Sequence, residues 1–162
     1  MSRRGPVHCL IDAHNVLHQD VILSRHMHEP ENARHLLEEL LADKPHMHVF
    51  YDGGPDGEQR AHRRQGLQID YSGNDEADNR IIRWLQQHSA QRAVVISDDH
   101  DLGRRARALG ATTANARGFL ENFRTAQQRT EGIRGPLSPA EVDDWMRIFG
   151  LDDSAGGPQK PI

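Results

Sequence analysis

Acidic side chains follow the apolar runs of this chain. Asp12, Asp52 and Asp98 each stand directly after such a run or one residue beyond it. Carboxylates that share one cleft repel one another, which raises some of their pKa values unless a cation balances the charge. Hard divalent cations such as Mg²⁺ and Mn²⁺ take oxygen ligands, so an all-carboxylate cluster suits them better than zinc. Further acids that could join such a cluster are Asp75, Glu76, Asp78, Asp99 and Asp101.

Some of these acids also have a purely structural interpretation. Asp75 could cap the helix that follows it, with Asp78 three residues later completing a capping box. Glu76 and Asp99 are typical of solvated or supporting positions rather than of cation ligands. We therefore leave the roles of Asp52, Glu76 and Asp99 open at this point.

Three acids are the stronger candidates from their place in the pattern. Asp98 and Asp101 are spaced i and i+3 at a predicted helix start, so they can face the same side. Asp12 directly follows a buried run and is followed three residues later by Asn15. These positions favour a role in binding or catalysis over a role in capping.

Short apolar runs and amphipathic stretches alternate along the chain, which predicts the elements that position the acids. Runs typical of buried strands cover residues 7–11, 49–51 and 93–96, with shorter strands expected at 67–72 and 111–115. Helical spacing of apolar residues predicts helices around 33–41, 77–88 and 102–109, the last of them stopped by Gly110. Strands that alternate with helices imply right-handed crossovers and a mostly parallel sheet. We therefore predict a three-layer α/β/α sandwich, whose carboxyl strand ends form the ligand-binding edge.

The last part of the chain has a different composition. Residues 131–151 combine a linker with an amphipathic helix, which Ser138 and Glu141 open as a capping box. Residues 152–162 have almost no apolar surface to bury and are expected to be disordered. We therefore divide the chain into an α/β domain over 1–130, the linker and C-terminal helix over 131–151, and the tail.

Composition excludes several classes of protein. The chain has 162 residues, of which 36% are hydrophobic, and no apolar run approaches the length that crosses a bilayer. The single Cys9 excludes an intrachain disulfide and a cysteine-rich zinc site, and it fits a reducing compartment. We expect a cytoplasmic protein without a membrane partner.

Charge is unevenly distributed. The net charge is −4, from 20 basic and 24 acidic side chains, so composition alone does not indicate a nucleic-acid-binding protein. The stretch from Gly103 to Arg134, however, contains seven arginines and only two glutamates. Arginine binds phosphate oxygens and stacks on bases, so this stretch could bind a polyanion or could be a solvated surface.

Eleven histidines allow a second metal hypothesis, which their surroundings do not favour. His14 and His18 are spaced i and i+4, and two H-M-H triplets occur at 26–28 and 46–48. None has the cysteine partners or the HExxH pattern of a zinc site. We interpret them as surface or strand-face residues and assign no role to His14.

Five segments, in order from about Val7 to Phe123, resemble a known family. They are LIDAHNVL (10–17), VFYDGG (49–54), YSGNDEADNRII (71–82), VVISDDHDL (94–102) and RALGATT (107–113). Together they resemble the NYN domain of the YacP-like family, a branch of the PIN-like metal-dependent ribonucleases. Glu76 departs from the pattern, because other members often have Thr or Ser before the Ala-Asp pair.

The resemblance implies a PIN-like fold with an acidic site for Mg²⁺ or Mn²⁺, and endoribonuclease activity. By position, Asp12, Asp78, Asp98 and Asp101 would be metal-site carboxylates, with Asn15 beside them. The partner would be single-stranded RNA such as mRNA, tRNA or rRNA, and the ribosome is a further candidate. Candidates to follow the RNA backbone are Arg104, Arg105 and Arg107, together with Arg60, Arg63 and Arg64 from the predicted loop after Asp52.

Two alternatives remain beside the endoribonuclease. A catalytically inactive module could keep the acidic pocket and act by binding RNA or a ribosomal partner. A phosphatase with an aspartyl nucleophile fits poorly, because the first strand is followed by D-A-H and not by the D-x-D of such enzymes.

Overall fold

The structure is a computed structural model of the chain and describes residues 7–42, 44, 46–54, 59–64 and 66–129. Within these residues the strands are β1 (His8–Asp12), β2 (Met47–Tyr51), β3 (Gln59–Arg64), β4 (Leu67–Ser72), β5 (Ala93–Ile96) and β6 (Thr112–Ala114). The helices are α1 (Ala13–Gln19), α2 (Pro30–Leu41), α3 (Ala77–Gln87), α4 (His100–Ala108) and α5 (Ala116–Arg129), with short 3₁₀ helices η1 (Leu23–His26) and η2 (Ala90–Arg92).

The strands form one sheet in the order β3-β4-β2-β1-β5-β6. All neighbouring strands are parallel except β3 and β4, which are antiparallel. In the centre of the sheet, Leu10 of β1 lies opposite His48 of β2 on one side and Val95 of β5 on the other. The predicted mostly parallel sheet is confirmed.

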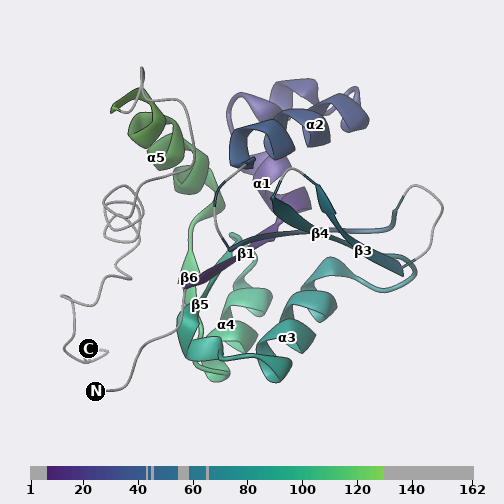
Figure 1. The fold of residues 1–162 in the computed structure, drawn as a ribbon, viewed down its shortest axis with the longest axis vertical. Helices are drawn as coiled ribbons and strands as arrows, with labels where there is room; N and C mark the ends of the chain where they lie inside the picture. Colours follow the sequence, from purple (N-terminus) through teal and green to yellow (C-terminus); the bar gives the residue numbers. More distant parts are fainter. Residues whose placement is uncertain (1–6, 43, 45, 55–58, 65, 130–162) are drawn as a thin grey trace.

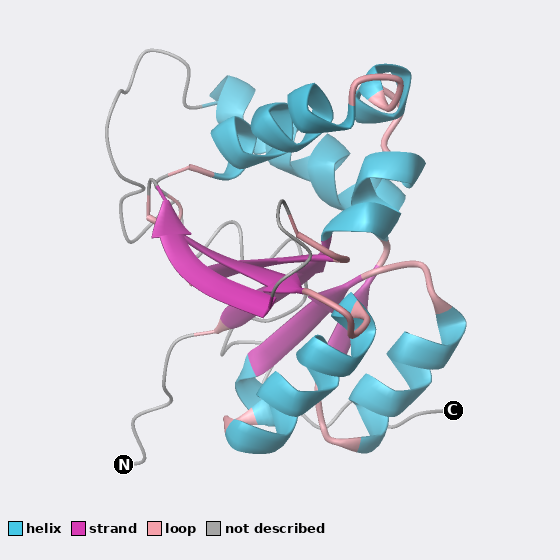
Figure 2. Ribbon diagram, turned by 90° about the vertical axis from the view of Figure 1, so that its right-hand side faces the viewer, coloured by secondary structure: helices cyan, strands magenta, loops and turns pink. Residues whose placement is uncertain are grey.

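Helices cover both faces of the sheet, as Figures 1 and 2 show. One core lies between the sheet and α1, α2 and α5, and it includes Ile11, Val49 and Ile96. The second core lies against α3 and α4, and it includes Leu10 and Val95. Because both faces are buried, these strands are apolar at nearly every position, which is why they could be predicted from the sequence.

The three helices predicted from apolar spacing are confirmed as α2, α3 and α4. Pro30 opens α2 at a position where the missing N–H costs no hydrogen bond. Gly110 follows α4 with a φ of 101°, and its N–H donates to the carbonyl of Arg107 at 2.9 Å. This is the left-handed helix end predicted for Gly110.

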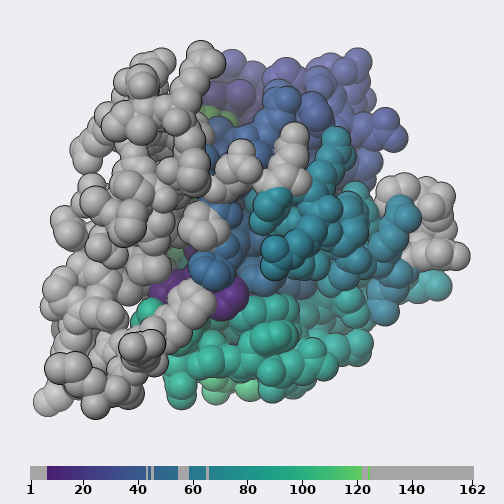
Figure 3. All heavy atoms as spheres, in the orientation of Figure 1, coloured from purple at the N-terminus to yellow at the C-terminus, as the bar shows by residue number. Residues whose placement is uncertain are grey.

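Two α-helices and one strand were not predicted from the sequence. Helix α1 begins directly after Asp12, and α5 follows β6 at the positions where only an arginine-rich stretch was noted. The segment expected to be a loop after Asp52 contains β3, so the expectation for the loop arginines Arg60, Arg63 and Arg64 was wrong in this respect. Figure 3 shows the β3–β4 region, in blue to teal, on the surface that faces the viewer.

Helix α5 is anchored to the domain by both apolar and charged contacts. Phe119 and Leu120 are buried in the same core as α1 and α2. The guanidinium of Arg124 donates to both carboxylate oxygens of Asp20, at 2.8 and 2.9 Å. The Asp20 side chain is only 2% exposed, and this pairing explains how its charge is tolerated.

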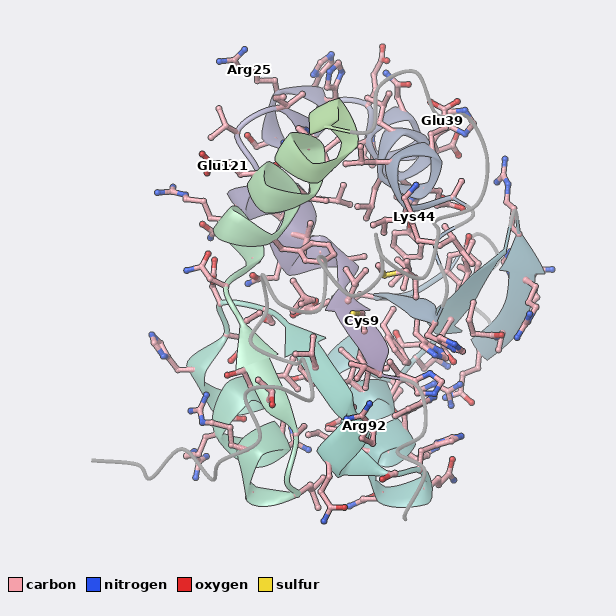
Figure 4. The ribbon with its side chains drawn as sticks, turned by 60° about the vertical axis from the view of Figure 1, so that its left-hand side comes forward. Cys9, Arg25, Glu39, Lys44, Arg92 and Glu121 are labelled. Carbon is pink, nitrogen blue, oxygen red and sulfur yellow. The ribbon has the colours of Figure 1, made fainter. Side chains whose placement is uncertain are left out.

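Cys9 lies in the interior on β1, while Arg25 and Glu39 point outward from the helical layer (Figure 4). Burial raises the pKa of the Cys9 thiol well above its ordinary value, so Cys9 is a packing residue. No helix in the described part of the chain has the length and apolar character that crossing a membrane requires. The predicted C-terminal helix in 131–151 and the tail in 152–162 lie outside the described residues.

Candidate functional site

A pocket of about 530 Å³ lies at the edge of the sheet where β1 and β2 end. Its walls come from the ends of these strands, from α1, and from the starts of α3 and α4. The described residues that line this acidic pocket are Asp12, His14, Asn15, His18, Asp52, Asp75, Glu76, Ala77, Asp78 and Asp99.

Asp12 is the most buried acid of the pocket, with 9% of its surface exposed. Its Oδ2 accepts a hydrogen bond from the Ser97 hydroxyl at 2.9 Å. Burial, with a smaller contribution from the nearby charges of Asp52 and Asp78, raises the pKa of Asp12 from its ordinary 3.8 to about 6, and the Ser97 hydrogen bond opposes this rise. At neutral pH the site therefore holds a carboxylate whose charge is poorly compensated.

The predicted partner Asn15 lies in the pocket, and Asp98 holds it in place. The side-chain oxygen of Asn15 accepts a hydrogen bond from the Asp98 N–H at 2.8 Å. The carboxylate of Asp98 accepts a hydrogen bond from the Ala116 N–H at 3.0 Å, at the start of α5. Asp98 is not among the residues that line the pocket. The structure thus gives the Asp98 carboxylate a partner in α5, which a sequence pattern of strand and helix could not indicate.

Asp99, and not Asp101, is the acid that α4 contributes to the pocket. The Oδ1 of Asp99 accepts hydrogen bonds from the N–H groups of Asp101 and Leu102, at 2.9 and 3.2 Å, and so caps α4. The Asp101 side chain is 58% exposed and pairs with Arg104 on the outer surface of the same helix. The expectation that Asp98 and Asp101 face the cleft together is therefore not met in this structure.

The start of α3 contributes three acids, and Asp52 holds it in place. The Oδ1 of Asp52 accepts a hydrogen bond from the Ala77 N–H at 2.7 Å, so it satisfies a free donor of the first helical turn. The hydrogen bond from the Asn79 amide lowers the pKa of Asp75. The adjacent charge of Asp78 raises the pKa of Glu76. In place of the possible capping box of Asp75 and Asp78, the carboxylate of Asp52, which follows β2, accepts the hydrogen bond from the start of α3.

Two histidines on α1 complete the wall of the pocket. The rings of His14 and His18 contact each other edge to face, with centroids 4.4 Å apart. His14 was assigned no role from the sequence, although its i, i+4 spacing from His18, directly after Asp12, was a usable signal. Both side chains are exposed, so they can contact a ligand that enters the pocket.

The oxygen donors of the pocket fit a hard divalent cation by their chemistry. Asp12, Asn15 and Asp78 line it together with Asp52 and Asp99, and none of its described walls carries a lysine or arginine to balance them. Among the residues that the structure describes, no three His, Cys, Asp or Glu side chains are close enough together to hold a metal ion. The oxygen ligands therefore surround an open pocket and do not form a preformed metal site.

The arginines predicted to bind RNA on α4 are engaged with neighbouring side chains. Arg104 pairs with Asp101, and Arg105 donates to the Asn79 side chain at 3.3 Å. Arg107 donates to the Thr113 hydroxyl at 3.0 Å, near the far end of α4. The three residues line no part of the pocket and stay predictions as RNA ligands.

The fold is similar to that of known proteins. The family model of the YacP-like NYN domain matches residues 9–137. The crystal structure of a mutant of Rae1 (YacP) from Bacillus subtilis is 22% identical, covers 78% of this chain and 80% of its own, and superimposes with a TM-score of 0.65. A second crystal structure of Rae1 (YacP) from Bacillus subtilis is 18% identical, covers 92% of this chain and 84% of its own, and has a TM-score of 0.61. No curated protein sequence matches. Because the family match spans most of the sequence, the chain belongs to the YacP-like NYN domain family and has a nuclease-like, RNA-related fold.

Proposed function

We propose that this chain is a metal-dependent endoribonuclease that cleaves RNA in the acidic pocket. The observation that carries the proposal is the buried Asp12, whose carboxylate lies among other acids at the carboxyl end of a central parallel strand. A cleft with this charge requires a cation or protons before an RNA phosphate can approach it. The family supports RNA as the substrate class.

Asp12 and Asp78, together with the Asn15 oxygen, are the residues that would hold Mg²⁺ or Mn²⁺. When bound, such an ion supplies Lewis-acid stabilisation of the phosphodiester and lowers the pKa of an attacking water. Because water and not the RNA 2′-hydroxyl is the nucleophile in this proposal, the products carry 5′-phosphate and 3′-hydroxyl ends.

The hydrogen bonds around the pocket prepare these side chains for that role. The Ser97 hydroxyl orients Asp12, and the Asp98 N–H orients Asn15. Asp52 and Asp99 hold the starts of α3 and α4 at the pocket, where the positive ends of the helix dipoles offset part of the negative charge. In this proposal, Asp98 is a positioning residue, and Asp99 takes the place in the cleft that we expected for Asp101.

The test is cleavage of an end-labelled pool of single-stranded RNA by purified protein in Mn²⁺, Mg²⁺ or EDTA. We expect cleavage in the presence of either cation and none in EDTA. Asp12→Asn and Asp78→Asn should each slow cleavage by at least about 100-fold, because the lost stabilisation is worth several kcal/mol. Glu39→Gln, which changes an exposed acid on α2 that does not line the pocket, is purified in parallel and should cleave as the wild type.

Two outcomes would contradict the proposal in different ways. Cleavage that persists in EDTA or in Asp12→Asn would show that the pocket is not the active site. RNA binding without cleavage in either cation would favour the inactive binding module. Comparing Asp99→Asn with Asp101→Asn then decides which acid of α4 supports the reaction.

A further inference from the structure

The two faces of strand β3 carry different side chains, and one face carries a histidine ring between two arginines. Side chains alternate along a strand, so Arg60, His62 and Arg64 project to the same face and Arg63 to the opposite one. Arg64 reaches Glu38 of α2 at 3.8 Å, which places this face on the same side of the sheet as α2. We call Arg60, His62 and Arg64 the β3 row.

The ring of His62 is the last member of a stack that crosses three strands. Tyr51 of β2 stacks on Tyr71 of β4 with centroids 5.5 Å apart, and Tyr71 stacks on His62 with centroids 5.6 Å apart. Tyr51 is buried, and its hydroxyl donates to Glu38 at 3.2 Å, so it fixes the inner end of the stack. Because β3 is the edge strand of the sheet, the stack ends at His62.

Positive charge surrounds the stack. The guanidinium of Arg34 lies 5.9 Å from the centroid of the Tyr51 ring. Arg60 and Arg64 are exposed and close enough to Tyr71 to influence its ionisation. Glu38, an acid that contacts the stack at Tyr51, is 7% exposed and lies behind it. An anionic ligand would therefore meet arginines first.

The β3 row begins beside the acidic pocket and leads away from it. Gln59, at the start of β3, pairs with Ser72, and the Ser72 hydroxyl accepts a hydrogen bond from the Gly53 N–H at 3.0 Å. Gly53 directly follows Asp52, which lines the pocket. At about 3.4 Å per residue, His62 lies roughly 10 Å along the strand from this edge. A flexible RNA strand bound in the pocket can therefore reach the β3 row within a few nucleotides.

We propose that the β3 row is a binding subsite for single-stranded RNA, in which a base stacks on His62 and phosphates contact Arg60 and Arg64. The proposal rests on the proposed function for the path of the RNA, which runs from the acidic pocket to the β3 row. Binding of RNA to the β3 row does not itself require cleavage. Aromatic rings with interleaved arginines bind single strands of any sequence, because every base has a face that can stack. The arginines on this edge also disfavour pairing with a strand of another protein.

Fluorescence anisotropy with a labelled single-stranded RNA, in EDTA to prevent cleavage, tests the subsite. His62→Ala should weaken binding by roughly 5- to 150-fold, because one stacked base is lost. His62→Phe keeps the ring and should bind within about threefold of the wild type. The Nδ1 of His62 has no hydrogen-bond partner among the described residues, so phenylalanine breaks no bond there.

The arginines are tested through the salt dependence of binding. Arg60→Gln and Arg64→Gln should each reduce the slope of log affinity against log salt by roughly 0.7, the value for one phosphate contact on a single strand. Arg63→Gln, on the same strand but the opposite face, should have a clearly smaller effect. Arg25→Gln, on the outer surface of η1, should change nothing.

The results separate this proposal from the proposed function. If RNA is bound but never cleaved, and the variants rank as described, the subsite stands and the nuclease proposal fails. If RNA is cleaved and His62→Ala binds as tightly as the wild type, the subsite is wrong and the nuclease proposal stands. Equal weakening by Arg63→Gln and Arg60→Gln, or equal weakening by His62→Phe and His62→Ala while both remain folded, also overturns it. A wild type without affinity for single-stranded RNA overturns it directly.

Discussion

Strand β1 begins in a group of histidines and ends in a group of acids. The histidine cluster consists of His8, His46, His48 and His88 around Trp84, at the end of the sheet where β1 and β2 begin. The acidic pocket lies at the end where the same strands finish. Both regions place titratable groups of one kind close together.

The two regions differ in how they relieve repulsion. In the histidine cluster, Nδ1 of His8 lies 2.9 Å from Nε2 of His48, a hydrogen bond that requires at least one neutral ring. Burial and the neighbouring histidines lower the pKa of His48 to about 4, so it is neutral at physiological pH. The neutral His48 ring packs on Trp84 with ring centroids 5.2 Å apart, and His88 stacks on the same indole at 4.1 Å. The acids, by contrast, line an open pocket whose negative charge attracts a cation.

The largest expected effect is an opposite pH dependence of stability in the two regions. The pKa of His48 is lowered from 6.5 to about 4, so the unfolded chain binds more protons and stability is lost as the pH falls through this range. Between pH 7.5 and pH 4, the unfolding free energy of His48→Gln should fall by roughly 3 kcal/mol less than that of the wild type, as measured by urea unfolding. The same loss in the variant as in the wild type would show that the cluster is not the cause.

Asp12 should act with the opposite sign. Its pKa is raised from 3.8 to about 6, so its contribution to stability is present below pH 3.8 and is lost as the pH rises through 6. Asp12→Asn should therefore be more stable than the wild type at pH 7 in EDTA, by roughly 2 to 3 kcal/mol. The difference should shrink as the pH falls toward 4. A variant that is less stable at pH 7 would mean that Ser97 and the helix start depend on the charge.

Divalent cations should distinguish the regions by a somewhat smaller effect. Mn²⁺ at one hundred times its dissociation constant should stabilise the wild type by about 2.7 kcal/mol. The double variant Asp12→Asn/Asp78→Asn should lose the increase in melting temperature, and His48→Gln should keep it. The reverse result would place the cation in the histidine cluster.

The smallest effect concerns the border of the acidic pocket. Asp98→Ala removes the acceptor for the first N–H of α5 and should cost about 1 kcal/mol of unfolding free energy. Asp101→Ala removes only an exposed pair with Arg104 and should stay within about 0.5 kcal/mol of the wild type. Urea unfolding in EDTA measures both. Equal costs would show that Asp98 does not cap α5.

Elements that are buried on both sides could be predicted well. The fully buried run at 93–96 matches β5 at both ends, whereas the segment at 67–72, which matches β4, was predicted from its alternation of apolar and polar residues. Strand β3, with the sequence QRAHRR, was missed because an edge strand needs no apolar alternation when its partner β4 supplies the pairing. Helix α1 was missed because it has only seven residues, too few for a clear helical repeat.

Part of the candidate site could be predicted for the same reason. Asp12 and Asp52 follow buried parallel strands, so their place at one edge follows from strand direction alone. Which of Asp98 and Asp99 enters the pocket does not follow from strand direction. Both residues follow β5, and the backbone N–H groups that each one caps decide where its carboxylate points. The partner of Asp98 is in α5, which contacts this site only after the chain has folded.

The sequence by itself determined the layers, the order of most elements and the edge at which the acids gather. These properties depend on local patterns of apolar residues and on the fixed direction of parallel strands. Only the tertiary structure decided that Asp99 enters the pocket in place of Asp101, that His14 and His18 line it, and that His62 completes a stack begun by Tyr51. Those arrangements join residues that lie far apart in the sequence, and their geometry is set by helix capping and by pairing across the sheet, which no local pattern records.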